Sequence, residues 1–301
     1  MSAPSSRPVV LAGATGDLGG RVAAALAAKG ASVRALVRAD GDPAKREALE
    51  RLGVEPVPVD FDDPGSLARA CEGVAVVVST LNGLGPTIVG LQTRLAEAAV
   101  AAGVPRFVPS DYSLDYTKTR PGDNRNMDLR REFNERIDAM PIRATSILNG
   151  AFANLLTGGA PIVLRGPKRI LYWGDGDQPT DFTTKDDTAA YTADVALDDR
   201  APRLLRIAGD AKTPVELAAL MTELTGERFK TLRAGGLGRL DLVIRVARTI
   251  APRRDAIFPV WQGMQYVRDM ASGRGKLDPL DNDRYGARRW TSARDVLAAH
   301  R

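Results

Sequence analysis

The chain has 301 residues, of which 44% are hydrophobic and 26% are charged, and it carries a formal net charge of +5. This composition is typical of a globular protein with a sizeable core. It excludes a membrane helix, which needs ~20 consecutive apolar residues, and Cys71, the only cysteine, excludes an internal disulfide.

Other counts narrow the class of protein further. The lysine and arginine residues are scattered, which argues against a nucleic-acid surface, and the single histidine, His300, argues against a histidine-rich metal site. We expect no metal. Residues 1–8 lack the apolar segment of a secretion signal, so we expect a cytoplasmic location.

A glycine loop follows the first apolar run of the chain. Residues 9–12 read as a strand, the loop is Gly-Ala-Thr-Gly-Asp-Leu-Gly, and residues 21–29 read as a helix. A strand followed by G-x-x-G-x-x-G and a helix is the arrangement that binds a dinucleotide pyrophosphate, because the start of the helix offers unpaired N–H groups and a partial positive charge. We expect cofactor contacts from Gly13, Thr15, Gly16, Asp17, Leu18 and Gly19.

Strand and helix signals alternate up to residue 150. Alternation of this kind implies right-handed crossovers and a parallel sheet with helices on both faces. We therefore predict an α/β fold with a Rossmann-type, doubly wound parallel sheet in a domain of residues 1–150. The predicted strands are 33–37, 54–59, 74–79, 106–108 and 142–148, and the predicted helices are 43–52, 64–71, 86–102 and 126–139.

The pattern changes after residue 150. Residues 161–165 and 169–173 read as a strand pair, and Thr213 with Glu216 forms a capping box that predicts the start of a helix. We predict a smaller, mixed α/β substrate lobe in residues 151–301, which could return segments to the first domain. Its other predicted elements are the helices 184–195, 214–225, 237–250, 256–270 and 292–299 and the strand 204–207.

The residue at the end of the second predicted strand distinguishes a site for NAD(H) from a site for NADP(H). A basic residue at this place, roughly 20 residues past the glycine loop, accommodates a 2′-phosphate, whereas an acidic one binds the 2′-hydroxyl. Arg38 stands there, and Lys45 and Arg46 follow. Asp40 comes two residues late, so NAD(H) is the less favoured cofactor and we expect NADP(H).

Further cofactor contacts are expected where later strands end, because ligands of such sheets lie beyond the carboxyl ends of the strands. Asp60 and Phe61 follow the third strand and could contact the adenine, although Phe61 could equally be a core aromatic. The remaining candidates are Thr80, Leu81, Asn82, Ser110, Asn149 and Phe152.

Three segments of the chain are similar to a known family. They are Gly13–Gly19, Arg34–Arg38 and Ala102–Tyr112, which contains Gly-Val-Pro-Arg-Phe-Val-Pro-Ser. Together they resemble the NmrA-like and isoflavone-reductase-like atypical short-chain dehydrogenases, over about residues 8–160. The resemblance implies a Rossmann domain, a preference for NADP(H), and a small C-terminal substrate lobe. Some members of the family reduce aromatic substrates, whereas others sense the dinucleotide without turnover.

The catalytic residues depart from those of the wider superfamily. No tyrosine of this chain is followed four residues later by lysine, so the Tyr-x-x-x-Lys pair is missing. The resemblance places Arg130 at or near the single lysine of the isoflavone-reductase branch. Arginine hardly gives up a proton, but it can polarise a carbonyl or hold an oxyanion. We expect Arg130 and Tyr112 to act in catalysis, with Tyr112 as a proton donor; a surface charge is the alternative for Arg130.

Aromatic and amide residues are candidates for the substrate pocket. Tyr112 and Tyr116 follow the fifth strand, and a predicted helical face carries bulky side chains. For any single one of them, core packing is the alternative. The candidates are Tyr112, Tyr116, Phe152, Trp261, Met264 and Gln265.

The sequence therefore favours an NADP(H)-dependent reductase that transfers hydride to a small, largely apolar or aromatic carbonyl or activated alkene. The alternative is a non-catalytic NAD(P)-sensing protein that binds a protein partner. We expect a small-molecule substrate, no nucleic acid and no membrane partner, and homodimer formation is left open. The basic, amphipathic residues 237–250 offer a membrane-surface role as the disfavoured alternative.

Overall fold

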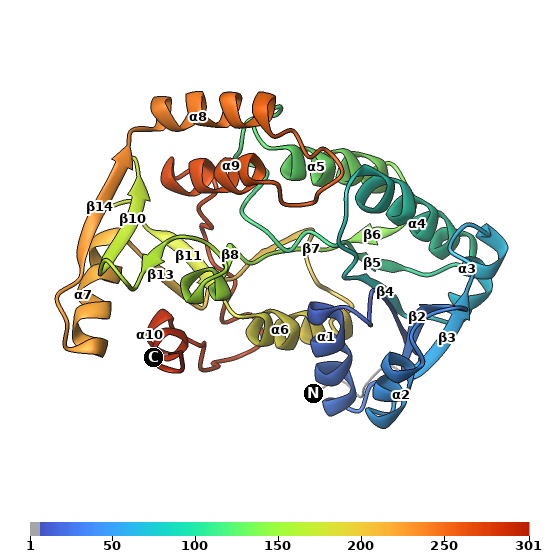
Figure 1. Cartoon of the computed structure of the whole chain (residues 1–301). Coiled ribbons are helices and arrows are strands. Elements are labelled where there is room, and N and C mark those ends of the chain that lie inside the picture. The colour runs from blue at the N-terminus through green and yellow to red at the C-terminus, as the bar shows by residue number, and fades with distance from the viewer. Residues whose placement is uncertain (1–6, 301) are drawn as a thin grey trace. The chain divides into compact units, whose positions relative to one another are not determined.

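The computed structural model describes residues 7–300 (Figure 1). The chain divides into two units, each assembled from segments that are separate in the sequence. The first unit comprises residues up to Asp111, Leu129–Ile147 and Thr188–Leu205, and the second comprises Tyr112–Asp128, Leu148–Asp187 and the chain from Arg206 onward. That residues 1–150 and 151–301 form separate domains stays a prediction.

A six-stranded sheet is the centre of the first unit, and its strand order is β3-β2-β1-β4-β5-β6. Every neighbouring pair is parallel, and Val9 of the central strand β1 lies between Val33 and Val76. This confirms the predicted Rossmann-type parallel sheet. The strands are β1 (Val9–Ala12), β2 (Val33–Arg38), β3 (Glu55–Val59), β4 (Val76–Ser79), β5 (Arg106–Val108) and β6 (Arg143–Ala144).

Helices flank this sheet, with α4 and α5 on one side and α1 and α6 on the other (Figure 1). Lys29, just after α1, forms an ion pair of 2.7 Å with Asp194 of α6. On the opposite side, Leu95, Phe107 and Phe133 belong to one buried apolar cluster. The helices are α1 (Asp17–Ala28), α2 (Pro43–Arg51), α3 (Pro64–Ala70), α4 (Gln92–Ala101), α5 (Arg125–Asp138) and α6 (Lys185–Leu197).

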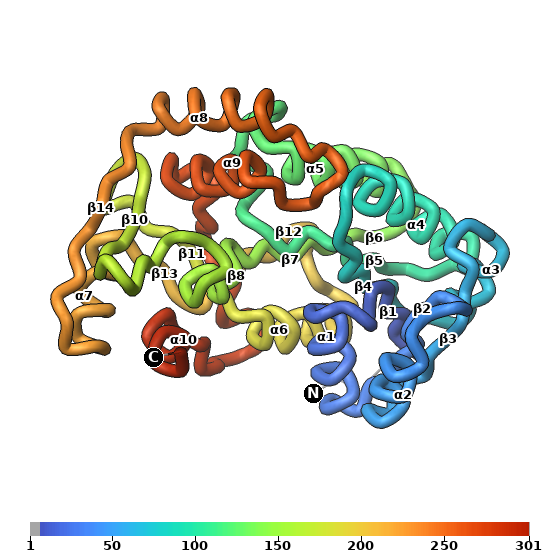
Figure 2. The backbone as a smooth tube through the Cα atoms, in the orientation of Figure 1, coloured from blue at the N-terminus to red at the C-terminus, as the bar shows by residue number. Residues whose placement is uncertain are grey.

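The second unit contains two small sheets, β14-β10-β9 and β13-β11-β8. Helix α7 packs on β10 and β14 (Figure 2). The predicted capping box is confirmed, because Thr213 and Glu216 each accept a hydrogen bond from the other's backbone N–H. The elements are β8 (Ala151–Phe152), β9 (Val163–Leu164), β10 (Arg169–Trp173), β11 (Thr180–Thr183), β13 (Asp210–Lys212), α7 (Pro214–Thr225), β14 (Lys230–Gly235), α8 (Leu237–Ile250), α9 (Val260–Ala271) and α10 (Ala293–Ala298).

Some predicted elements differ from the observed ones. The predicted helix 86–102 begins as a π-helical segment, Pro86–Leu91, before α4. The predicted strand 142–148 is two strands, β6 in the parallel sheet and β7 (Ser146–Leu148), which pairs with β12 (Leu204–Arg206). The two strands follow each other with only Thr145 between them, and no glycine or proline interrupts the run, so the sequence carries no sign of the change of partner.

Four strands, β8, β11, β13 and β14, were not expected from the sequence. Most of the side chains of β14 are exposed, so it lacks the alternation of apolar and polar residues that identifies a strand. Within the described residues, no helix combines the length and apolar character that spanning a membrane requires.

Candidate functional site

The glycine loop between β1 and α1 contains two glycines at which an added side chain would clash with neighbouring atoms. Gly13 has φ = +87°, and a Cβ there would lie 2.8 Å from the Thr80 hydroxyl oxygen. A Cβ on Gly19 would lie 2.0 Å from the Gly13 carbonyl oxygen. The loop therefore packs directly on the end of β4, which places the start of α1 at the carboxyl edge of the sheet.

The start of α1 fits an anionic group. Gly16 is the N-cap residue and no side chain caps the helix, so the first N–H groups of α1 have no side-chain acceptor. Thr15, Gly16 and Asp17 are exposed there, whereas Leu18 is half-buried. The Asp17 carboxylate accepts a hydrogen bond of 2.9 Å from Arg21 Nε, which offsets its negative charge beside the anion site.

The three cations predicted for the 2′-phosphate differ in their contacts near the loop after β2. Arg46 donates from Nη2 to the carbonyl of Arg38 at 2.7 Å and also to the carbonyl of Ala39, so it stabilises the loop. The side chains of Arg38 and Lys45 are exposed, and neither forms an ion pair within residues 7–300. These two cations are therefore available to a phosphate, while Arg46 is occupied by backbone oxygens.

The two candidates after β3 stabilise their own loop. The Asp60 carboxylate accepts a hydrogen bond of 2.9 Å from the backbone N–H of Asp62. Phe61 is half-buried and packs against the apolar cluster of the first unit. The structure thus gives Phe61 a core role, and adenine contacts by Asp60 and Phe61 stay predictions.

Hydrogen bonds join the loops after β4 and β5. Thr80 donates from its hydroxyl to the Ala12 carbonyl at 3.0 Å, and Ser110 donates from Oγ to the Leu81 carbonyl at 2.7 Å. Asn82 is exposed beside them. The carboxyl ends of β1, β4 and β5 thereby form one continuous edge, as a bound dinucleotide requires.

A buried polar cluster lies directly behind this edge in the first unit. The Asp111 side chain is fully buried, and its Oδ2 accepts hydrogen bonds from Ser146 Oγ at 2.6 Å and Asn134 Nδ2 at 2.8 Å. Arg203 donates to Ser146 Oγ at 2.8 Å and also to Asn134 Oδ1. Burial raises the pKa of Asp111, and the hydrogen bonds from Ser146 and Asn134 offset only part of this rise.

Arg130 belongs to the same neighbourhood. It is half-buried on α5, and its backbone carbonyl accepts a hydrogen bond of 2.8 Å from Asn134 Nδ2. Its positive charge lowers the pKa of Asp111, which shows that the guanidinium and the carboxyl interact electrostatically. Arg130 is therefore half-buried rather than fully exposed, and its part in catalysis stays a prediction.

Asn149 has an unusual environment in the second unit. Its backbone is fixed, because its N–H donates to the Ser113 carbonyl at 3.0 Å and its carbonyl accepts from Thr183 Oγ1 at 2.7 Å. Its side chain is fully buried, yet neither the amide nitrogen nor the amide oxygen has a hydrogen-bond partner. An unsatisfied buried amide costs free energy, and such groups are candidates for binding a ligand.

The predicted substrate residues are all placed within the second unit. Tyr112 and Tyr116 are buried, and Phe152 is half-buried with Lys185 Nζ lying 5.8 Å from its ring centroid. These placements leave their roles toward a ligand as predictions.

Two of the candidates on α9 have structural partners. Trp261 donates from Nε1 to the Pro252 carbonyl at 2.8 Å, and the Arg125 and Arg248 guanidinium groups lie 4.8 and 5.2 Å from its ring centroid. Gln265 is buried and accepts from the Arg125 backbone N–H at 3.3 Å. Met264 is half-buried, and its side chain has no polar group that could form such a hydrogen bond. Substrate binding by these residues stays a prediction.

The cluster of Asp111, Asn134, Ser146 and Arg203 was not predicted from the sequence. These residues come from the loop after β5, from α5, from β7 and from the chain before β12, so no local pattern joins them. The one available signal was a carboxylate placed between Ser110 and Tyr112 at the end of an apolar strand.

Residues 7–300 support neither a metal site nor a nucleophilic cysteine. No group of three or more His, Cys, Asp or Glu residues that could hold a metal ion occurs there. Burial raises the pKa of the Cys71 thiol to about 11, so this cysteine is a core residue rather than a thiolate nucleophile.

Comparisons with known proteins agree with this arrangement. The isoflavone reductase homolog IRL of Zea mays is 34% identical over 236 residues, which cover 74% of this chain and 75% of that protein. Pinoresinol reductase 1 of Arabidopsis thaliana is 29% identical over 266 residues, 83% of each chain. The solved structure of AtPrR2 with NADP+ and (+)pinoresinol shares the fold, with a TM-score of 0.82 and 24% identity over the whole of both chains. The NmrA-like family matches residues 5–236, and the chain therefore belongs to this family.

Proposed function

We propose that this protein is an NADP(H)-dependent reductase. The single observation that carries the proposal is the carboxyl edge of the sheet, where the uncapped start of α1 and the exposed, unpaired Arg38 offer two separate sites for phosphate. One suits the pyrophosphate and the other the 2′-phosphate. The similarity to AtPrR2, described with NADP+, supports the same cofactor.

The cofactor, when bound, supplies a hydride, and the protein supplies position and charge. The glycine loop and Arg38 hold the phosphates, and the unsatisfied amide of Asn149 fits the carboxamide of the nicotinamide, which offers one donor and one acceptor. Arg130 stabilises negative charge that develops on the substrate oxygen. Tyr112 donates the proton that completes the reduction.

The substrate we propose is a small, largely apolar or aromatic carbonyl compound or activated alkene. The relatives are named for pinoresinol and isoflavone reduction, which supports an aromatic substrate. Tyr116, Phe152 and Met264 would contribute apolar surface to its binding, and Trp261 and Gln265 would act through the backbone contacts that they stabilise.

Consumption of NADPH with a panel of aromatic aldehydes, ketones, enones and pinoresinol tests this function. We expect turnover with at least one member of the panel and slower turnover when NADH replaces NADPH. Tight binding of NADPH without turnover of any member would contradict a reductase.

That outcome would favour the alternative, a non-catalytic NAD(P)-sensing protein that binds a protein partner. The specific observation in its favour is the arginine at position 130 together with the missing Tyr-x-x-x-Lys pair, because arginine does not release a proton and Tyr112 has no lysine four residues later. The cytoplasmic location and a homodimer stay predictions.

A further inference from the structure

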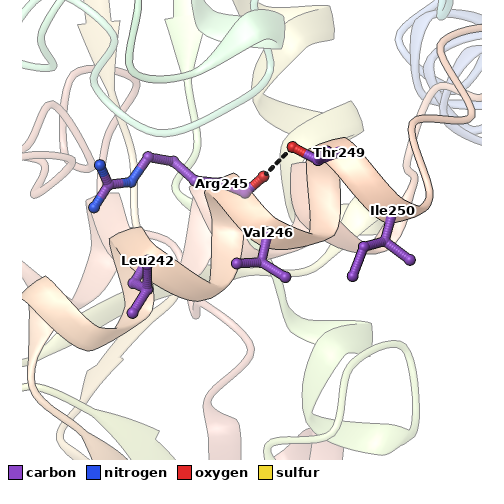
Figure 3. A pocket seen from close by; sticks show the side chains of 5 residues that line it. All are labelled: Leu242, Arg245, Val246, Thr249 and Ile250. Atoms are coloured by element: carbon purple, nitrogen blue, oxygen red, sulfur yellow. Dashed lines mark hydrogen bonds between the residues drawn. The ribbon is translucent and has the colours of Figure 1, made fainter.

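Helix α8 presents an apolar stripe that no other part of the described chain covers. Its inner side chains Leu240 and Ile244 are buried, and α8 packs on α9. Its outer side chains Leu242, Val246 and Ile250, spaced four residues apart, are 52%, 47% and 78% exposed. Figure 3 shows these three side chains in one row along the helix.

Positive charge surrounds the stripe. Residues 237–256 contain five arginines and two aspartates, and one of these, Asp241, already pairs with Arg268 at 3.3 Å. The arginines are exposed, and none forms an ion pair with a carboxylate within residues 7–300; they are Arg239, Arg245, Arg248, Arg253 and Arg254. Phe258 and Val260, just beyond, are also strongly exposed.

The shape and charge of this surface argue against a partner helix and against a second copy of the chain as its binding partner. The shallow hollow on it is lined by Leu242, Arg245, Val246, Thr249 and Ile250, which all belong to one helix (Figure 3). No second element forms an opposite wall, whereas a groove that binds a partner helix needs two. A second copy of the chain docked through the same face would bring two sets of unpaired arginines together, which is unfavourable.

An anionic bilayer meets both features of the surface. A single amphipathic helix can lie flat in the headgroup region, where the apolar stripe leaves water and the arginines contact phosphates. We propose that α8 and the loop that follows it bind the surface of an anionic phospholipid membrane. This differs from the sequence-based expectation of no membrane partner, because the sequence did not show that the stripe faces outward.

Sedimentation with vesicles tests the proposal on the full chain. We expect binding to phosphatidylcholine vesicles that contain phosphatidylserine, weaker binding to pure phosphatidylcholine, and release by high salt because screening weakens the arginine contacts. The triple variant Leu242→Ser/Val246→Ser/Ile250→Ser should lower partitioning about tenfold or more. Arg245→Glu/Arg253→Glu should lower it on anionic vesicles alone.

A matched control replaces exposed apolar residues elsewhere, as Leu52→Ser/Val215→Ser, and should bind vesicles like the wild type. NADPH binding by every variant checks that the chain is folded. Absence of vesicle binding, or equal binding by the triple variant, would overturn the proposal. The proposal would also be overturned if the wild type did not bind vesicles but formed a concentration-dependent dimer, or captured an acidic peptide, and the triple variant had lost that interaction.

Discussion

Ser146 donates a hydrogen bond of 2.6 Å to Asp111 in the interior of the first unit, and Asn134 donates a second one to the same carboxyl oxygen. Ser146 lies on β7, Asp111 lies in the loop after β5, and Asn134 lies on α5, which also carries Arg130. The two hydrogen bonds therefore fix the loop after β5 next to α5. Asn134 Nδ2 also donates to the backbone carbonyl of Arg130 at 2.8 Å, so the cluster adjoins the helical turn that carries the arginine we place in catalysis.

The first prediction concerns Asp111 and pH. Its folded-state pKa is raised by burial, so its contribution to the free energy of unfolding is fully present below the unfolded pKa, ~4, and is lost as the pH rises through the folded pKa. The free energy of unfolding of the wild type minus that of Asp111→Asn should therefore fall as the pH rises from acidic to neutral. Denaturant titrations at several pH values measure this difference, in which other titrating groups cancel. A difference that stays constant or rises would be contrary to the assignment.

The second prediction concerns the choice of cofactor. Arg38→Glu should weaken NADPH binding about tenfold or more, because a cation beside the 2′-phosphate becomes an anion, and should affect NADH far less. Arg51→Glu, at the exposed end of α2, is the matched control and should change neither affinity. Calorimetric titration with both cofactors gives the comparison. Equal losses for NADPH and NADH would remove Arg38 from the 2′-phosphate site.

The third prediction compares two neighbouring glycines of α1. Gly19→Ala places a methyl group 2.0 Å from the Gly13 carbonyl oxygen, so the loop must move, and we expect a loss of about 1–3 kcal/mol in stability together with weaker NADPH binding. Gly20→Ala meets its nearest atom at 3.5 Å and should be neutral or stabilise the helix by about 0.5–1 kcal/mol. Thermal unfolding with and without NADPH measures both effects. Similar behaviour of the two variants would mean that the loop does not depend on this close packing.

The fourth prediction uses the unsatisfied amide of Asn149. Asn149→Leu is similar in size and removes two buried polar atoms without partners, so the cofactor-free protein should become more stable, by about 1–3 kcal/mol. NADPH should bind more weakly to the same variant, because the carboxamide loses its partner. Asn134→Leu is the contrasting control: its amide is bonded to Asp111, and it should destabilise the protein. Unchanged NADPH affinity in Asn149→Leu would exclude Asn149 from the cofactor site.

The fifth prediction concerns Arg130. Arg130→Ala should lower kcat at least about tenfold while the Kd for NADPH stays nearly unchanged, because the arginine acts on charge that develops in the reaction. Arg130→Lys should keep most of the turnover, since lysine retains the charge and can also release a proton. Steady-state kinetics on the best substrate of the panel provide the test. If Arg130→Ala turned over like the wild type, the arginine would have no part in the mechanism.

The sequence by itself determined the features that depend on neighbouring residues. The glycine loop, the alternation of strands and helices up to β5, and the bounds of α7 and α8 follow from local spacing and capping, and the structure confirms them. The position of Arg38 at the end of β2 also follows, because it depends only on where that strand ends.

Tertiary structure alone decided which groups are paired, buried or exposed. Arg46 differs from Arg38 only because its guanidinium folds back onto the backbone of the loop. Asp111, Asn134, Ser146 and Arg203 are far apart in the chain and meet because the sheet and α5 pack together. In the sequence, the apolar residues of α8 show only the periodicity of a helix. Packing on α9 buries one apolar face of the helix and leaves the stripe exposed. Pairing and burial depend on contacts between distant segments, which the order of residues does not contain.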